Sequence, residues 1–226
     1  PQAIREALRT PGVTVELYAT TEAEARHPDI VAAARDAGVP VHRTSGEVMA
    51  ELTQTVTPQG LVAVCRFVHV PLEEAVRPGA RLVAVLAHVR DPGNAGTVLR
   101  TADAAGADAV VFTDASVDPY NGKCVRASAG SLFHLPVSIN ARFPETVRQA
   151  REAGLRILAA DASGARTLDE VDLSRPTAWV FGNEAWGLPP ELLELADEVV
   201  RVPIYGRAES LNLATAAAVC LYASAR

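Results

Sequence analysis

Aromatic residues, cysteines and lysines are scarce in this chain of 226 residues: aromatics make up 5%, there are three cysteines, and Lys123 is the only lysine. The cysteines, Cys65, Cys124 and Cys220, share no metal-binding spacing, so the pattern favours buried thiols in a reducing cytosol over disulfides or a metal site. No apolar run approaches the roughly 20 residues that a membrane-spanning helix needs, so none is predicted. With few aromatics, the core is expected to be aliphatic and rich in alanine.

Two nucleotide-binding signatures and a metal signature are also missing. No Gly-x-Gly-x-x-Gly fingerprint follows the first strand, and no Walker loop is present. Those glycine-rich turns bring backbone N–H groups close to phosphates, so their absence argues against a dinucleotide-dependent dehydrogenase and an NTPase. No group of histidine, cysteine and carboxylate side chains has the spacing of metal ligands, so no metal is predicted.

Negative charge predominates in the chain. The formal net charge is −6 and the isoelectric point is near 5.4, which taken alone argues against a nucleic-acid partner, because basic patches normally supply affinity for phosphates. Nearly all of the positive charge is arginine, however, and arginine suits phosphates and stacked bases better than lysine does. Local arginine clusters, or a basic segment before Pro1, can overcome the negative total. Because the sequence begins without methionine, we expect residues before Pro1.

Two apolar runs near the C-terminus organise the rest of the chain. Ala178–Phe181 has strand length and stops at Gly182–Glu184, and Glu198–Val202 stops at Pro203–Arg207. The segment that follows, Leu213–Ala223, is apolar nearly all round and is predicted to form a buried helix. Ligands of open α/β sheets bind at the carboxyl ends of the strands, so these polar, glycine-bearing loops are predicted to line a pocket.

The first third of the chain reads as a small α/β module. Alternating and β-branched residues predict strands at Val13–Ala19, Val39–His42 and Gln59–Cys65. Helices are predicted at Ala23–Ala37, interrupted near Pro28, and at Gly46–Leu52, capped by Ser45. Prolines and mixed charges mark Pro71–Gly79 as a linker that holds a turn of helix at Leu72–Ala75.

From Arg81 onward, strands and helices alternate. Strands are predicted at Arg81–His88, Ala109–Phe112 and Leu155–Ala160, and helices at Ala95–Ala105, Pro144–Ala153 and Pro189–Ala196. Asn94 is predicted to cap the first of these helices, with Arg100 on its polar face. A helix N-terminus binds anions, and an arginine near it adds a fork for an RNA phosphate. A solvated surface arginine is the alternative for Arg100.

Three segments carry a resemblance to a known family. Asp91–Arg100, Phe181–Leu188 and Ile204–Asn212 resemble, in order, the three motifs of the SpoU/TrmH family, the RNA 2′-O-ribose methyltransferases of the SPOUT superfamily. Arg126–Phe133 also matches members of the family, whereas Ala185 stands where many members carry glycine. The overall pattern is similar to the resistance methyltransferases of antibiotic producers, of the thiostrepton and avilamycin type.

The resemblance implies an α/β fold: a SPOUT-type parallel sheet with a C-terminal trefoil knot, preceded by a small L30e-like α/β domain. It divides the chain into an RNA substrate-binding domain at residues 1–68, a linker at 69–80 and a methyltransferase domain at 81–226. A generic α/β layer is the alternative for the first domain. Physical reasoning alone would not predict a knot, because chains rarely thread through their own loops. Homodimers with the active site at the interface are usual in the family.

The resemblance also implies S-adenosyl-L-methionine as the cofactor and assigns residues to three roles. The implied catalytic residues are Arg100, Asn94, Glu184, Ser210 and Asn212. The implied cofactor contacts are Ala160, Asp161, Phe181, Gly182, Asn183, Gly187, Val202, Ile204, Ser210, Leu211, Asn212 and Ala214. The implied RNA contacts are Arg100, Arg126, Ser128 and Arg207, with a surface ion pair as the alternative for Arg126.

The expected reaction is methylation of one ribose 2′-oxygen in 23S ribosomal RNA in the cytoplasm, with antibiotic resistance as an open consequence. The implied role of Arg100 is to hold the adjacent phosphate and favour the oxyanion. Because arginine stays protonated in proteins, a role as base is not expected, and a phosphate or water is expected to accept the proton. Three alternatives stay open: transfer RNA as the substrate, an inactive RNA-binding relative, and a small-molecule enzyme favoured only by the acidic isoelectric point.

Overall fold

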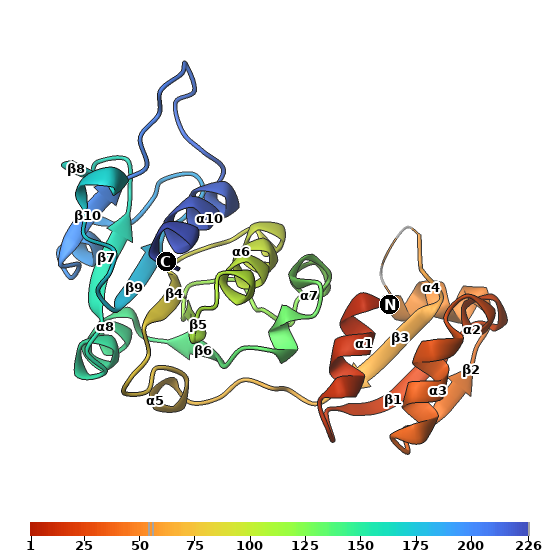
Figure 1. Cartoon of the computed structure of the whole chain (residues 1–226). Helices are drawn as coiled ribbons and strands as arrows, with labels where there is room; N and C mark the ends of the chain where they lie inside the picture. The colour runs from red at the N-terminus through yellow and green to blue at the C-terminus, as the bar shows by residue number, and fades with distance from the viewer. Residues whose placement is uncertain (54, 56, 226) are drawn as a thin grey trace. The chain divides into compact units, whose positions relative to one another are not determined.

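The computed structural model describes residues 1–53, 55 and 57–225 (Figure 1). The chain folds into two compact units, Pro1–Val68 and His69–Arg226. Gln54 and Val56 of the predicted first domain, and Arg226 at the end of the predicted methyltransferase domain, lie outside the described residues. Within the described residues, no helix combines the length and the apolar character required to cross a membrane.

The first unit is a three-stranded sheet packed against short helices. Its strand order is β2-β1-β3, with β1 parallel to β2 and antiparallel to β3. The strands are β1 Thr14–Ala19, β2 Val41–Arg43 and β3 Leu61–Cys65. The helices are α1 Gln2–Arg9, α2 Thr21–Arg26, α3 Pro28–Asp36 and α4 Gly46–Thr53. The predicted interruption before Pro28 is confirmed, whereas α1 was not predicted.

The second unit is built on a seven-stranded sheet in which every neighbouring pair is parallel. The strand order is β6-β5-β4-β9-β7-β10-β8. The strands are β4 Leu82–Leu86, β5 Ala109–Thr113, β6 Val137–Ala141, β7 Arg156–Ala160, β8 Arg166–Thr167, β9 Thr177–Phe181 and β10 Glu198–Arg201. All residues of β4, β5 and β9 are buried, and all except Thr113 and Thr177 are apolar, as is typical of strands in a parallel sheet.

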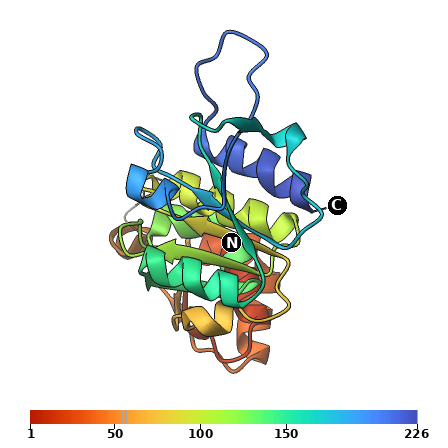
Figure 2. The ribbon, with the colours of Figure 1, turned by 90° about the vertical axis from the view of Figure 1, so that its left-hand side faces the viewer.

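Helices cover both faces of this sheet (Figures 1 and 2). One face carries α6 Pro92–Ala104, α7 Gly122–Ser128 and α10 Leu213–Ser224. The other carries α5 Leu72–Ala75 and α8 Phe143–Glu152, whose apolar residues join the core cluster that holds Val83 and Val85 of β4. The shorter helices are α9 Pro190–Leu193 and the 3₁₀ turns η1 Ser131–Phe133 and η2 Leu168–Glu170.

The segment predicted as a linker packs into the second unit. Ala75, Val76 and Ala80 are buried in its core. The backbone N–H of Val70 also donates to the carbonyl of Val137 on β6, at 2.9 Å. The chain from His69 onward is therefore structurally part of the second unit.

Several details differ from the sequence predictions. Asp91, not Asn94, caps α6: its carboxylate accepts from the backbone N–H of Asn94 at 2.7 Å. The helix predicted at Pro189–Ala196 shortens to α9. Helix α10 is not buried all round, because Val219 is 39% exposed and Tyr222 is 51% exposed. The strands β6 and β8 were not predicted.

Candidate functional site

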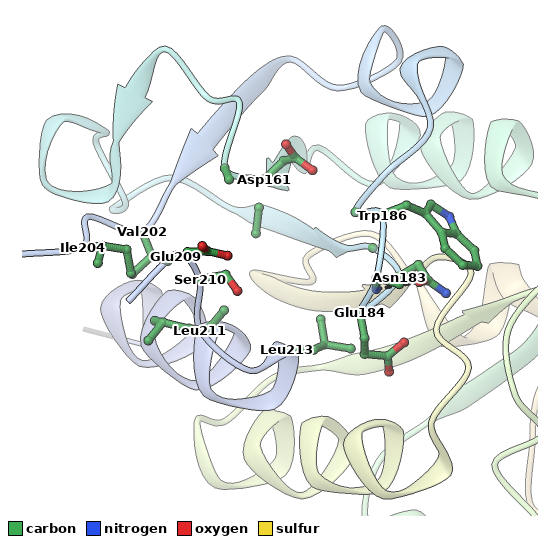
Figure 3. Close-up of a pocket in the computed structure, with 16 residues that line it drawn as sticks. Asp161, Asn183, Glu184, Trp186, Val202, Ile204, Glu209, Ser210, Leu211 and Leu213 are labelled. Atoms are coloured by element: carbon green, nitrogen blue, oxygen red, sulfur yellow. Dashed lines mark hydrogen bonds between the residues drawn. The ribbon is translucent and has the colours of Figure 1, made fainter. Parts of the chain in front are cut away.

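A pocket of about 420 Å³ opens at the carboxyl edge of the sheet (Figure 3). Its walls are the loops that follow β7 and β9, the segment that follows β10, and the first turn of α10. The volume falls within the roughly 300–1,000 Å³ of small-molecule sites. The predicted cofactor residues that line it are Ala160, Asp161, Gly182, Asn183, Gly187, Val202, Ile204, Ser210 and Leu211.

The wall after β9 is a tight hairpin. Asn183 and Gly187 exchange both backbone hydrogen bonds, at 2.8 and 2.9 Å, and Asn183 Oδ1 accepts from the N–H of Ala185. A Cβ at Gly182 would lie 2.5 Å from the carbonyl carbon of Gly187, so only glycine fits there. The alanine at position 185 is thus compatible with a closed hairpin.

The hairpin is fastened to the loop after β7 and to the end of β4. Asp161 accepts from the N–H of Leu188 at 3.4 Å, and Gly187, with φ +70°, leaves room for this carboxylate. Asn183 Nδ2 donates to the carbonyl of His88 at 2.9 Å. These bonds fix the wall before any ligand arrives.

The pocket is acidic. Asp161, Glu184 and Glu209 line it, and none of the described residues lining it is lysine, arginine or histidine. Carboxylates in a concave site stabilise a positively charged ligand and disfavour phosphates. The pocket therefore suits an organic cation better than a nucleotide.

The three predicted motifs meet in one hydrogen-bond network. Glu184 accepts from the backbone N–H groups of Arg90 and Asp91, both at 3.3 Å, and from Asn94 Nδ2 at 3.2 Å. Asn94 Oδ1 accepts from Asn212 Nδ2 at 3.0 Å. Asn212 in turn caps α10 by accepting from the N–H groups of Ala214 and Thr215. Glu184, Asn94 and Asn212 thus join the first turns of α6 and α10 to the hairpin.

The N-terminus of α6 carries an ion pair. Lys123 Nζ lies 2.7 Å from Asp91 Oδ2, and both side chains are partly exposed. The hydrogen bond from Lys123, with that from the Asn94 N–H, lowers the pKa of Asp91 from its ordinary value. Asp91 therefore stays ionised as the cap of the helix that presents Asn94.

The predicted arginines lie outside the pocket lining. Arg100, Arg126 and Arg207 are exposed, and within the part of the chain that the structure describes, the Arg100 side chain makes no ion pair or hydrogen bond. Their guanidinium groups are available to an incoming anion. Ser128, in contrast, is buried and donates to the carbonyl of Val125, so its side chain is not accessible to RNA in this structure.

Two predicted cofactor residues stand behind the lining. Phe181 is buried and stacks on Trp179, and Ala214 is buried in the first turn of α10. Asn212 also lies outside the lining, where it acts through the network described above. Lining residues that are not among the implied cofactor contacts are Ala162, Glu184, Ala185, Trp186, Glu209, Leu213 and Ala216, of which Glu184 was implied as catalytic.

The cysteines offer no nucleophile to this site. Burial raises the pKa of the Cys220 thiol to about 12, and burial together with Asp118 and Asp91 raises that of Cys124 to about 12. Cys65 is half-buried rather than buried. Among the described residues, no group of three or more histidine, cysteine or carboxylate side chains could hold a metal ion.

Comparison with protein families decides the lineage. The model of the SpoU rRNA Methylase family matches residues 81–222, and the model for RNA 2′-O ribose methyltransferase substrate binding matches residues 1–71. The chain belongs to the SpoU rRNA methylase family. The mixed α/β architecture, with a parallel sheet and a preceding substrate-binding module, is the one found in solved members of this family.

Named relatives resemble most of the chain. The 23S rRNA (guanosine(2553)-2′-O)-methyltransferase RlmP of Bacillus subtilis is 38% identical over 97% of this chain and 84% of its own. The 23S rRNA (guanosine-2′-O-)-methyltransferase RlmB of Bordetella pertussis is 35% identical over 85% of this chain and 80% of its own. Both names describe ribose methylation of large-subunit RNA in those proteins.

Solved structures show the same fold. The AdoMet-bound rRNA methyltransferase from Sinorhizobium meliloti superposes with a TM-score of 0.84 at 32% identity, covering 99% of this chain and 84% of that one. The SpoU methyltransferase AviRb from Streptomyces viridochromogenes gives 0.85 at 28% identity, covering 99% and 86%. These two likenesses extend over both units of the chain.

Proposed function

We propose that this SpoU-family chain transfers a methyl group from S-adenosyl-L-methionine to one ribose 2′-oxygen of 23S ribosomal RNA in the cytoplasm. The observation that carries the proposal is the acidic pocket beside the Glu184–Asn94–Asn212 network. Relatives named as 23S rRNA methyltransferases, and a similar structure with AdoMet bound, support the choice of substrate and cofactor.

The residues present fit this cofactor. When bound, it supplies a methyl group already activated by a sulfonium, a cation that the carboxylates of Asp161, Glu184 and Glu209 favour. The glycines of the hairpin bring backbone N–H and C=O groups to the pocket surface, where they can hydrogen-bond an adenine or an amino-acid moiety. Val202, Ile204 and Leu211 supply apolar contacts to the adenine.

The network positions the acceptor oxygen. We assign Asn94 to the ribose, held in place by Glu184 and Asn212, and Arg100 to the phosphate next to it. A guanidinium fork holding that phosphate stabilises the charge that develops as the 2′-hydroxyl loses its proton. Arginine stays protonated in proteins, so Arg100 does not accept the proton, which passes to a phosphate oxygen or water. Ser210 faces the pocket as a further hydroxyl for substrate or cofactor.

Exposed arginines provide RNA contacts despite the net charge of −6. Arg126 at the end of α7 and Arg207 in the segment after β10 are both exposed. We assign them to RNA phosphates, where each contact adds salt-dependent affinity. Ser128 is not retained among these contacts, because it is buried.

We further propose a homodimer in which Arg100 completes the pocket of the partner copy. The exposed Val219 and Tyr222 of α10, and the absence of Arg100 from the pocket lining, support this arrangement. Mixing Arg100→Ala subunits with Ser210→Trp subunits, whose pocket is filled, should restore about a quarter to a half of wild-type activity through one intact hybrid site. Failure of the mixture, with subunit exchange verified, would place Arg100 in its own subunit.

The C-terminal trefoil knot is likewise proposed, on the strength of the family resemblance. It requires the segment between β10 and α10 to pass through a loop formed by the preceding strands. The closeness of that segment to the hairpin, both lining one pocket, supports it. The chain can be cut by a protease within residues 203–212 and then refolded. Whether the cut chain keeps its compact pocket through this treatment would distinguish a threaded path of the segment from an unthreaded one.

The test of the reaction has two parts. Calorimetry of the intact chain with S-adenosyl-L-methionine is expected to show one site per chain, and labelled methyl groups should enter 23S RNA but not transfer RNA. Mass spectrometry of digested RNA then identifies the 2′-O-methylated nucleotide. Absence of cofactor binding would overturn the proposal, transfer-RNA labelling would redirect it, and binding without transfer would indicate an inactive relative.

Antibiotic resistance is a second proposed outcome of the same reaction, favoured by the likeness to AviRb. A sensitive bacterial host that expresses the chain should tolerate a higher concentration of an inhibitor that binds its 23S RNA. The Arg100→Ala chain, expressed at the same level, is the matched control and should leave the host sensitive.

A further inference from the structure

Trp186 is an exposed indole on the lip of the pocket. It is 61% exposed, although aromatic residues make up only 5% of the chain. The other tryptophan, Trp179, is fully buried in β9, where its Nε1–H donates to Ser224 Oγ at 2.8 Å. Trp179 therefore has an ordinary structural role in the core, whereas Trp186 lies outside the core.

The position of Trp186 is fixed by its hairpin. Its two neighbours along the chain are Ala185, whose N–H donates to Asn183 Oδ1, and Gly187, which is bonded to Asn183 in both directions. The residue is thus presented by a closed three-residue loop and not by a long mobile segment. A large apolar surface that is held in water gains the favourable free energy of burial only when a partner covers it.

Trp186 is among the residues that line the pocket, but its indole is not directed at the centre of the cavity. In Figure 3 the indole points away from Ile204 and Ser210, toward the outside of the hairpin. It lies instead on the side of the loop where the side chains of Asn183 and Glu184 are found, next to the network that holds Asn94. A group that covers this indole therefore approaches from outside the pocket.

We infer that Trp186 is a stacking platform for an unstacked nucleobase of the bound RNA, and so a specificity-determining residue for the proposed methylation. This inference rests on the proposed function. Proteins read single-stranded RNA by stacking splayed bases on aromatic side chains, and each such contact is worth about 1–3 kcal/mol. In a chain whose net charge is −6, stacking supplies affinity that the overall charge does not.

The first test separates an aromatic face from mere bulk. Trp186→Ala and Trp186→Leu should lower kcat/KM for target RNA by about 5- to 150-fold, the factor that corresponds to one stacked base. Trp186→Phe keeps a ring and should remain within about threefold of wild type. The loss should appear mainly in KM for RNA, while the affinity for S-adenosyl-L-methionine by calorimetry changes less than about twofold.

The second test uses fluorescence, because the chain has only two tryptophans. Target RNA should quench the emission of wild type, whereas in Trp186→Phe, which retains only the buried Trp179, it should leave the emission unchanged. S-Adenosyl-L-methionine alone should quench much less than RNA does. Equal quenching by both ligands would mean that the indole covers the cofactor and would overturn the inference.

Outcomes for the inference and for the proposed function are distinguishable. If wild type binds no cofactor or methylates no RNA, the proposed function fails whatever Trp186 does. If wild type methylates RNA and Trp186→Leu does so equally well, the function stands and the platform is wrong. If Trp186→Ala dissociates a wild-type dimer in light scattering, the indole belongs to a subunit interface, which also overturns the inference.

Discussion

The two walls of the pocket differ in how they are held. The hairpin after β9 is closed by reciprocal backbone bonds, fastened by Asp161 and Asn183, and so tight that Gly182 admits no side chain. The opposite wall, residues 203–212, extends beyond the sheet and its helices, and Tyr205 within it is 87% exposed (Figures 1 and 2). One wall is held by its own hydrogen bonds, and the other is largely exposed to solvent.

This difference predicts that the two walls respond differently to substitution. A preformed wall can bind a small cofactor without losing conformational entropy on binding. An open segment with few buried contacts belongs to the least stable part of a structure and loses conformational entropy when a ligand orders it. Arg207 and Ile204 belong to the open wall, and the Glu184 network belongs to the closed one. Substitutions in the closed wall should therefore disturb the pocket more than matched substitutions in the open wall.

The largest effect is expected from a methyl group added to the closed wall. Gly182→Ala places a Cβ 2.5 Å from the carbonyl carbon and 2.6 Å from the oxygen of Gly187, which must move. At a cost of about 3 kcal/mol, cofactor affinity should fall about 100-fold by calorimetry. The matched control is Gly206→Ala in the open wall, where no atom lies within 4 Å and little change is expected. Equal losses in the two variants would remove the distinction between the walls.

The next effect concerns Asn212, where the open wall joins the network. Asn212→Ala removes the cap of α10 and should cost about 1–2 kcal/mol in urea unfolding, together with methyl transfer. Asn212→Asp keeps an oxygen to cap the helix but cannot donate to Asn94 Oδ1. It should therefore keep its stability and still lose activity. If Asn212→Asp transfers methyl groups normally, the bond to Asn94 has no part in the reaction.

Asp91 tests how far the closed wall depends on the start of α6. Asp91→Ala should cost about 1 kcal/mol at pH 7 because the helix loses its cap. Lys123 lowers the pKa of Asp91, so the stabilising contribution is present above the ordinary pKa of about 3.8 and is lost as the pH falls through the lower folded value. The gap between wild type and variant in urea unfolding should thus narrow below about pH 4. A gap that widens on acidification would contradict this assignment.

The smallest effect is expected at His88, whose carbonyl accepts from Asn183. Its φ of +60° is strained for any residue with a side chain. His88→Gly relieves the strain but also raises the conformational entropy of the unfolded chain, which opposes folding. A net gain in stability of about 0.5 kcal/mol is therefore expected in thermal unfolding. His88→Ala keeps the strain and is the control. A loss of stability in the glycine variant would show that the histidine side chain outweighs its backbone.

Much of the fold was predictable because the second unit is a buried parallel sheet. β4 is apolar at every position and β9 at every position after Thr177, and the loops after β7, β9 and β10 then had to meet at one edge. Confirmed in this way are the sheet, the family and the meeting of the three motifs. The roles of individual site residues stay predictions until the variants are measured.

The errors have local physical causes. Asp91 and Asn94 both suit a helix cap, and Pro92, which favours the first helical position, was the signal that Asp91 precedes the helix. Ser128 is buried because Gly96 lets α7 approach α6 closely, a contact between two helices that no periodicity reveals. Trp186 was missed because hairpin closure, and not the sequence, turns it outward.

The strand order of the second unit also has a consequence for folding during synthesis. β4 and β9 lie side by side in the sheet, with Leu82 paired to Thr177, so the middle of the sheet closes only after the later strand has left the ribosome. At about 5–20 residues per second, that delay is roughly 5–20 s. Throughout this interval β4 has an unpaired apolar edge that can aggregate. A chaperone is therefore most useful to the chain during this period.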